Sequence, residues 1–292
     1  TGDSGESGGP LDVDAVGAAV TRGGEGARFG EAVALGTVDA LGMTAFSRQD
    51  YNGAWIIGIP LADLTVGGSN EPEVLTDEGP ESFGSAISVI ERSDGEARLL
   101  VGVPLQSVVS VYEPRAAGVV PASGALVGES SGDEFGASLT TWVDDRAFVG
   151  VGAPGAPCGA AYFARWPVQD DETLDATVLF AGSGRKLVPG PCEQSPARFG
   201  AALAIGDFDG TGLPGVVVGA PGEFDGAGAA YVLDDLAAAP DNDGVVYAED
   251  TARIGGELAG GGLGTAVTIG DLDGDGRAEV VLAAPGVDNG AP

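Results

Sequence analysis

The clearest chemical pattern in the chain is an acidic stretch, GDLDGDGRAEVVLAAPG, at residues 270–286. Oxygen-bearing groups recur at positions 1, 3, 5, 7 and 9 of a short loop, namely Asp271, Asp273, Asp275, the carbonyl of Arg277, and Glu279. Alternate residues of a tight loop point inward, and Ca²⁺ takes about six to eight such hard oxygen ligands. The spacing therefore predicts a calcium loop at these five residues.

This stretch has two other interpretations, an EF-hand and a solvated acidic hairpin. An EF-hand requires an acidic residue at position 12 and a following helix, whereas position 12 is Leu282 and a strand-like apolar run follows. That motif is therefore excluded. A solvated acidic hairpin is the remaining alternative, because Gly274 and Gly276 permit the backbone angles of a tight turn with or without a metal.

A second, weaker copy of the loop lies at residues 207–215, DFDGTGLPG. The groups at positions 1, 3, 5 and 7 are Asp207, Asp209, Thr211 and the carbonyl of Leu213. Position 9 is Gly215, so the last carboxylate of the pattern is missing. We expect calcium to bind here less tightly than in the first loop.

The charge balance and composition exclude several classes of protein. Among 292 residues, 44 are acidic and 13 basic, which gives a net charge of −31. Such a field repels nucleic acid and anionic lipid and attracts cations. The absence of histidine excludes Ser-His-Asp and Cys-His catalysis and imidazole metal sites. No apolar run approaches the roughly 18–20 residues of a membrane helix, so no transmembrane segment is expected.

The two cysteines, Cys158 and Cys192, lie 34 residues apart, with glycine and proline close to both. This pattern favours a disulfide formed in an oxidising compartment. Two unpaired thiols are the alternative.

Two phrases recur along the chain and define a repeated unit. The first, FGxAxAxG with variations, begins near residues 28, 82, 134, 198 and 262, and the second ends at Pro60, Pro104, Pro154, Pro221 and Pro285. Short runs of small and β-branched residues, punctuated by Gly, Pro and Asp, predict three or four strands per unit and little helix. Units of this length and content are typical of β-propeller blades, with a β-sandwich as the alternative.

The phrases resemble the FG-GAP repeat, the unit that builds the head of integrin α-chains. Residues 198–233, RFGAALAIGDFDGTGLPGVVVGAPGEFDGAGAAYVL, follow the family order of FG, strand, acidic loop, strand, GAP and strand. The resemblance covers residues 28–292 and is strongest in the last two units. It implies an all-β propeller whose first loop in a blade holds calcium. It also implies protein or carbohydrate partners on one ring face.

The ends of the chain lead to a prediction about ring closure. The phrase GAAV at residues 17–20 matches the third-strand phrase that begins at Gly159 and Gly228. We therefore expect residues 11–20 to complete the fifth blade and close a five-bladed ring over residues 11–292, which would remove an open sheet edge. A fragment of a seven-bladed integrin-like propeller is the alternative. Residues 1–10 are expected to be a flexible tether, suited to surface or lipid attachment.

Together these features predict a calcium-binding, non-catalytic interaction or adhesion module of integrin-like type. Its expected location is extracellular, periplasmic or at the cell surface. A structural unit of the cell envelope is one alternative. An accessory propeller of a hydrolase is another, because catalysis in such enzymes lies outside the repeats.

Overall fold

The computed structural model describes most of the chain between Arg28 and Val287. The described residues are 28–38, 41–50, 53–60, 73–76, 82–91, 97–115, 118–143, 147–166, 174–175, 184–190, 197–236, 245–247 and 251–287. Within these ranges the regular structure is almost entirely β-strand, which confirms the all-β part of the predicted fold class. No helix in the described ranges is long and apolar enough to cross a membrane.

The strands form five sheets, numbered here in chain order. Sheet 1 contains β1 (Arg28–Val38), β2 (Leu41–Asp50), β3 (Gly53–Pro60) and β4 (Glu73–Thr76). Sheet 2 contains β5 (Ile87–Glu91), β6 (Ala97–Val103), β7 (Val108–Arg115), β8 (Gly118–Val127) and β12 (Leu174–Asp175). Sheet 3 contains β9 (Ser138–Val143), β10 (Ala147–Ala153), β11 (Ala160–Arg165), β13 (Arg185–Val188) and β17 (Val245–Tyr247).

Sheets 4 and 5 have four and two described strands. Sheet 4 contains β14 (Ala202–Gly206), β15 (Gly215–Ala220), β16 (Ala229–Leu233) and β18 (Ala252–Gly255). Sheet 5 contains β19 (Ala266–Gly270) and β20 (Glu279–Ala283). Two short helical turns follow second strands, η2 (Pro104–Gln106) after β6 and α3 (Glu223–Gly226) after β15.

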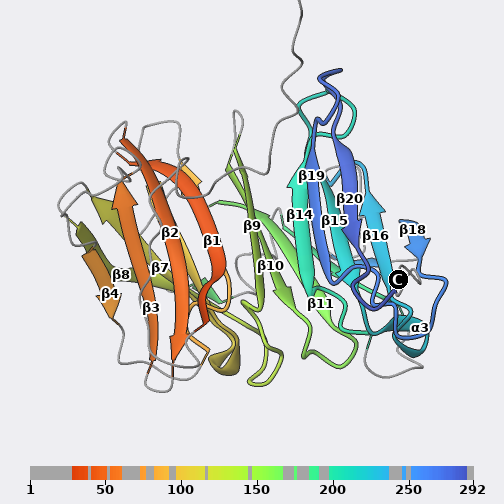
Figure 1. Ribbon diagram of the computed structural model, residues 1–292, viewed down its shortest axis with the longest axis horizontal. Helices are drawn as coiled ribbons and strands as arrows, with labels where there is room; N and C mark the ends of the chain where they lie inside the picture. Colours follow the sequence, from red (N-terminus) through yellow and green to blue (C-terminus); the bar gives the residue numbers. More distant parts are fainter. Residues whose placement is uncertain are drawn as a thin grey trace, which may run out of the picture.

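The five sheets lie one after another through their first strands. β1, β5, β9, β14 and β19 contact one another in that order. Figure 1 shows β1, β9, β14 and β19 following one another across the molecule. Consecutive units therefore form consecutive sheets, as in a propeller. Among the described strands no pairing joins β1 to β19. Residues 1–27 fall outside the described ranges, so the tether at 1–10 and the closure of a five-bladed or larger ring stay predictions.

The phenylalanines of the FG phrases form the core between adjacent sheets. Phe135 is fully buried among residues of sheets 2 and 3, and Phe199 among residues of sheets 3 and 4. Each contacts a tyrosine of its own sheet, with ring centroids 5.5 Å apart for Phe135 and Tyr162 and 5.3 Å for Phe199 and Tyr231. The strongly apolar second strands β6, β10 and β15 complete this core.

Glycines of the FG and GAP phrases bring the backbones of neighbouring sheets into contact. Within sheet 3, the N–H of Gly136 donates to the carbonyl of Gly152 at 2.9 Å. The carbonyl of Gly200, which leads into sheet 4, lies so close to Gly152 that a Cβ there would overlap it. Gly219 and Gly264 repeat this approach between sheets 4 and 5. Only a residue without a Cβ permits it.

Sheet 5 departs from this pattern at Ala283, which stands where Gly219 stands in sheet 4. Ala283 still accepts the N–H of Gly264 at 3.0 Å. Its side chain lies on the exposed face of sheet 5 together with Val281, which is 44% exposed, whereas the equivalent Val217 is fully buried beneath sheet 5. Within the described part of the chain, no further sheet covers this face.

Sheets 2 and 3 each gain a fifth strand from the following unit. β12 pairs in parallel with β8, and β17 pairs in parallel with β13. Both added strands come from the excursion between the third and fourth strands of the next unit. The sequence predicts three or four strands per unit and misses these two, because strands of two or three residues show no measurable alternation.

We expect Gly219→Ala to lower the free energy of unfolding by about 1–3 kcal/mol, because the added Cβ would overlap the carbonyl of Gly264. Denaturant unfolding followed by circular dichroism measures the change. The matched control is Ala283→Gly at the equivalent exposed position, which should cost no more than about 1 kcal/mol. Equal effects of the two substitutions would contradict the proposed glycine contact.

Candidate metal centre

A tight hairpin between β19 and β20 carries the first acidic loop. Gly270 pairs with Glu279, so residues 271–278 form the connection. Apolar side chains on one face of this hairpin pack against sheet 4. There, Ile269 lies beside sheet 4, 3.0 Å from the Cβ position of Gly206. This packing positions the loop at one end of the molecule, next to the equivalent loop of sheet 4 (Figure 1).

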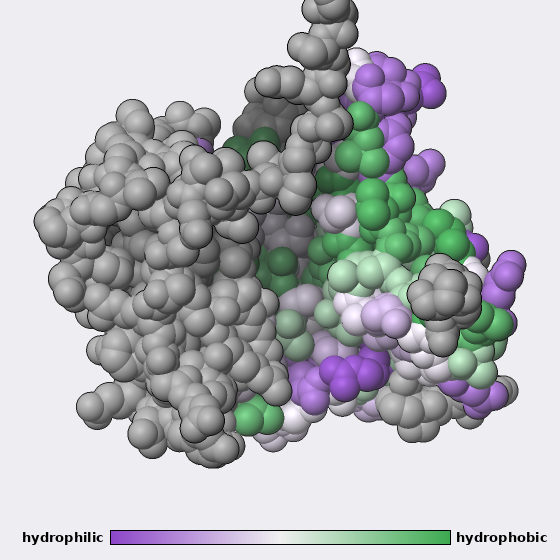
Figure 2. Space-filling model, in the orientation of Figure 1, coloured by the Kyte–Doolittle hydropathy of each residue, from purple (hydrophilic) through white to green (hydrophobic). Residues whose placement is uncertain are grey.

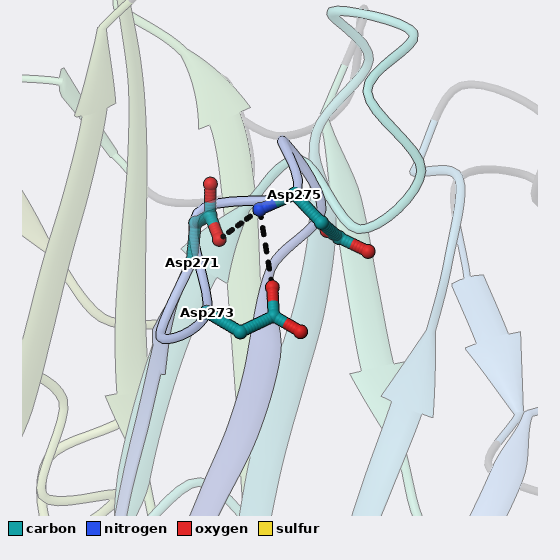
Figure 3. A group of neighbouring side chains, drawn as sticks. All are labelled: Asp271, Asp273 and Asp275. Atoms are coloured by element: carbon teal, nitrogen blue, oxygen red, sulfur yellow. Dashed lines mark hydrogen bonds between the residues drawn. The ribbon is translucent and has the colours of Figure 1, made fainter.

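Asp271, Asp273 and Asp275 come together in this loop (Figure 3). One carboxylate oxygen from each lies within 4.8 Å of the others, and all three residues are exposed. Hard oxygens gathered in this way are the donor set that Ca²⁺ prefers. Three carboxylates at such short range also repel one another, which favours a divalent cation between them. The three aspartates therefore fit a calcium ion.

Asp271 organises the backbone of the loop. Its Oδ1 accepts the N–H groups of Gly274 at 2.7 Å and Asp275 at 3.1 Å, and its Oδ2 accepts that of Gly276 at 2.9 Å. The Asp275 N–H also donates to Oδ1 of Asp273, at 3.1 Å. Gly274 and Gly276 have φ values of 79° and 86°, which are costly for other residues. The polypeptide thus presents the three carboxylates without help from other parts of the chain.

The last two predicted ligands have other visible roles. Oε2 of Glu279 accepts the N–H of Leu272 at 2.7 Å and closes the base of the hairpin. The N–H of Arg277 donates to Oδ1 of Asp275 at 2.8 Å. The structure does not bring Glu279 into the group of three carboxylates. Calcium binding by Glu279 and by the Arg277 carbonyl stays a prediction.

The second loop, between β14 and β15, repeats the same hydrogen bonds position by position. Asp207 Oδ1 accepts the N–H groups of Gly210 at 2.9 Å and Thr211 at 3.2 Å, and Oδ2 accepts that of Gly212 at 2.8 Å. The Thr211 N–H donates to Oδ1 of Asp209 at 3.0 Å. Asp207 therefore corresponds to Asp271 in the geometry as well as in the sequence.

The second loop differs from the first in two of its predicted ligand positions. The Thr211 hydroxyl donates to Asp209 Oδ1 at 2.6 Å, so position 5 supplies a neutral oxygen in place of a carboxylate. At position 9, the ring of Phe208 lies so close to Gly215 that a Cβ there would overlap it. Leu213 is 41% exposed, and its carbonyl stays a predicted ligand. Weaker calcium binding at this loop stays a prediction.

Asp207 is held as a carboxylate by its surroundings. Desolvation is the largest single influence and acts to raise the pKa of its carboxyl, but four backbone N–H groups together outweigh it and keep that pKa below the ordinary 3.8. The donors belong to Gly212, Asp209, Gly210 and Thr211. Asp207 is therefore ionised at neutral pH and available to a cation.

The two loops lie beside each other. The carbonyl oxygen of Gly276 is 3.2 Å from the Cβ position of Gly210. Figure 2 shows hydrophilic residues gathered at the upper right, over these two loops, with a hydrophobic area below them over β19 and β20. The negative charge of one loop is thus added to that of the other, so both attract cations.

Two clusters of tyrosine, carboxylate and cation were not predicted from the sequence. In sheet 4, the Tyr231 hydroxyl donates to Glu223 at 2.7 Å, and Arg253 Nε lies 3.6 Å from the same carboxylate. In sheet 3, Lys186 contacts Glu129 at 2.6 Å and lies over the ring of Tyr162. Burial first, and then the carboxylate, raises the pKa of each tyrosine. The repeated GAAY phrase is the signal that identifies them.

Comparison with known proteins identifies the last unit. Residues 263–291, which contain the whole β19–β20 hairpin and the first acidic loop, match the family model of the FG-GAP repeat. No curated protein sequence matches the chain.

Calcium should raise the melting temperature of the native chain, and a chelator should reverse the rise, because the ion offsets repulsion among three carboxylates. At calcium concentrations about 100-fold above Kd the stabilisation is about 2.7 kcal/mol. Asp271→Asn should abolish this increment and Asp207→Asn should reduce it less. The control is Asp225→Asn, outside both loops, which should leave it unchanged. Identical melting with calcium and chelator would refute the site.

Proposed function

Because residues 263–291 are an FG-GAP repeat, we propose that the chain is a calcium-stabilised, non-catalytic interaction module of integrin-like propeller type. The observation that carries this proposal is the group of Asp271, Asp273 and Asp275, with their oxygens within 4.8 Å of one another on a rigid hairpin. The neighbouring loop supports it, because the same hydrogen bonds in two loops indicate that this geometry belongs to the repeated unit.

Calcium is proposed to act as a structural clamp on the last sheet. When bound, it supplies positive charge at the centre of the loop. Asp271 then holds both the ion and the backbone of the hairpin, since three N–H groups already donate to it. A fixed hairpin keeps β19 and β20 paired, and an isolated two-stranded hairpin is only marginally stable in water.

An interaction role fits the carboxylates better than catalysis does. In both loops the carboxylates accept backbone N–H groups from their own hairpin and are exposed to solvent. General acid–base catalysis instead calls for a group positioned against a substrate and tuned in pKa by its surroundings. Protein or carbohydrate partners remain the proposed ligands, and no nucleic-acid partner is proposed for a chain of net charge −31.

The proposed location is outside the cytoplasm, either extracellular, periplasmic or at the cell surface. The FG-GAP repeat, the acidic composition and the cysteine pair favour this location. Cys158 is buried at 6% exposure at the turn before β11, and Cys192 falls outside the described residues. The Cys158–Cys192 disulfide accordingly stays a prediction.

A five-bladed closed ring remains our proposal for the whole fold, with residues 11–20 added to the free edge of β20. The exposed face of sheet 5, with Val281 at 44% exposure, supports a missing neighbour. Ala283 adds a constraint, because its methyl group occupies the place where the other interfaces admit a carbonyl of the next sheet. Sheet 1 would then have to pack on sheet 5 at a slightly greater distance than in the other interfaces.

The interaction role predicts a partner whose binding depends on calcium. A glycan array and a pull-down against cell-surface proteins, each run with calcium and with chelator, should give a partner that is lost on chelation. Asp271→Asn should weaken its capture, and Asp225→Asn should not. If neither screen gives a partner with calcium present, the interaction role is wrong.

Ring closure predicts that deleting residues 11–20 will lower the melting temperature sharply, because the edge of β20 and the face of sheet 5 would lose their cover. Deleting residues 1–10, the proposed tether, is the matched control and should leave the melting temperature unchanged. If neither deletion changes the melting temperature, closure by residues 11–20 is excluded.

A further inference from the structure

The junction between sheets 3 and 4 and the junction between sheets 4 and 5 are built alike where the third strand begins. Gly159, just before β11, pairs with Phe199 of the next unit, and Gly228, just before β16, pairs with Leu263. In each pair, a Cβ on the glycine would overlap the carbonyl oxygen of the residue opposite. The two junctions can therefore be compared residue by residue.

In the junction between sheets 4 and 5, the connection of residues 256–262 closes around Ala227, the residue before Gly228. The carbonyl of Ala227 accepts the N–H of Leu263, just after the connection, at 3.0 Å. At the other end, Gly256 lies so close to Ala227 that a Cβ there would overlap its carbonyl. The N–H of Gly256 also donates to the carbonyl of Gly228 at 2.8 Å. Both ends of this connection are therefore held against Ala227.

The two cysteines occupy the corresponding places in the junction between sheets 3 and 4. Cys158 corresponds to Ala227, because each precedes the glycine of its pair, and it is 6% exposed. Cys192 belongs to the connection of residues 189–198, which leads from β13 into sheet 4, and it lies outside the described residues. Cys158 is not a free thiol, and the chain has one other cysteine.

We propose that a disulfide between Cys158 and Cys192 is the covalent link that holds sheet 4 on sheet 3. It would join the two segments that close packing brings together at Ala227 in the next junction. Disulfide exchange forms such a bond: the two cysteines lose two protons and two electrons, and an oxidant of the disulfide class takes them up and becomes two thiols. This proposal goes beyond the interaction function, since it concerns how two units are held together.

The position of the link predicts which contacts depend on it. Gly159 and Phe199 pair directly beside Cys158, and Phe199 is fully buried in the core between sheets 3 and 4. A disulfide stabilises a fold mainly by restricting the unfolded chain. It also prevents the two joined segments from separating. Loss of the link should therefore loosen the contact of Gly159 with Phe199 first.

The link is separate from the acidic loops. In sheet 4 the acidic loop precedes β15 and the GAP phrase follows it, so the two lie at opposite ends of that strand. Cys158 follows the GAP phrase of sheet 3. Reduction of the disulfide and removal of calcium are therefore expected to destabilise different contacts, and either proposal can be refuted without the other.

Peptide mapping tests the pairing in the full chain. Free thiols are first blocked with iodoacetamide, and the chain is then digested with trypsin without reductant. Residues 147–165 and 187–198 each contain one cysteine and should appear as one linked species that reduction separates. Alkylation of either cysteine in the folded chain, or a link between two copies of the same peptide, would overturn the proposal.

Thermal unfolding measures the contribution of the link. Reduction should lower the melting temperature of the native chain by at least about 5 °C. The double variant Cys158→Ala with Cys192→Ala has alanine in the place of Ala227, so it should fold, and an unchanged circular dichroism spectrum verifies this. It should melt at the temperature of the reduced native chain and should not respond to reductant. Equal melting of the oxidised and reduced native chain would overturn the proposal.

Hydrogen exchange locates the effect of the link. The N–H of Gly200, beside Phe199, donates to Gly219, and the equivalent N–H of Gly264 donates to Ala283, both at 3.0 Å. Reduction should speed exchange at Gly200 at least roughly tenfold and leave exchange at Gly264 unchanged. No change at Gly200, or the same change at both amides, would show that the link does not act on this junction and would overturn the proposal.

Discussion

The approach of one glycine backbone to another across neighbouring sheets is the contact on which the rest of the structure depends. In sheets 2 to 5 the FG glycine donates its N–H to the second strand of its own sheet, and in sheets 3 to 5 its carbonyl rests against the second strand of the preceding sheet. The carbonyls of Gly136, Gly200 and Gly264 rest in this way on Gly102, Gly152 and Gly219. One residue type thereby sets the distance between sheets, and the phenylalanine beside it fills the space that this distance leaves.

The same contact explains why the acidic loops are neighbours. Because adjacent sheets meet along their first strands, the hairpins that follow those strands emerge at one end of the molecule. Gly210 and Gly276 therefore lie in contact distance, and two negative loops are held together by packing elsewhere in the fold. Because the hydrophobic core holds these like charges close together, they attract cations. This attraction does not depend on which loop has the better ligands.

Much of this structure could be predicted from repeated phrases, because glycine and phenylalanine at fixed positions report backbone contacts directly. The three aspartates could be predicted because alternate residues of a tight loop point toward its centre, so their carboxylates come close together. The added strands β12 and β17 could not, since their partners lie in the preceding unit and their lengths are too short for a pattern. The role of Glu279 at the base of its hairpin was likewise hidden, because its partner is the backbone N–H of Leu272.

Position 9 shows how a metal loop and the core compete for one place. Where position 9 is Glu279, its carboxylate accepts a backbone N–H, and the residue at position 2, Leu272, is 69% exposed. Where it is Gly215, the half-buried ring of Phe208 occupies the volume that a side chain would need. A carboxylate could return to position 9 only if that ring moved outward and lost its packing. The loop of sheet 4 is therefore closed by an apolar ring where the loop of sheet 5 is closed by a carboxylate, and both loops have the aspartates that fold the turn.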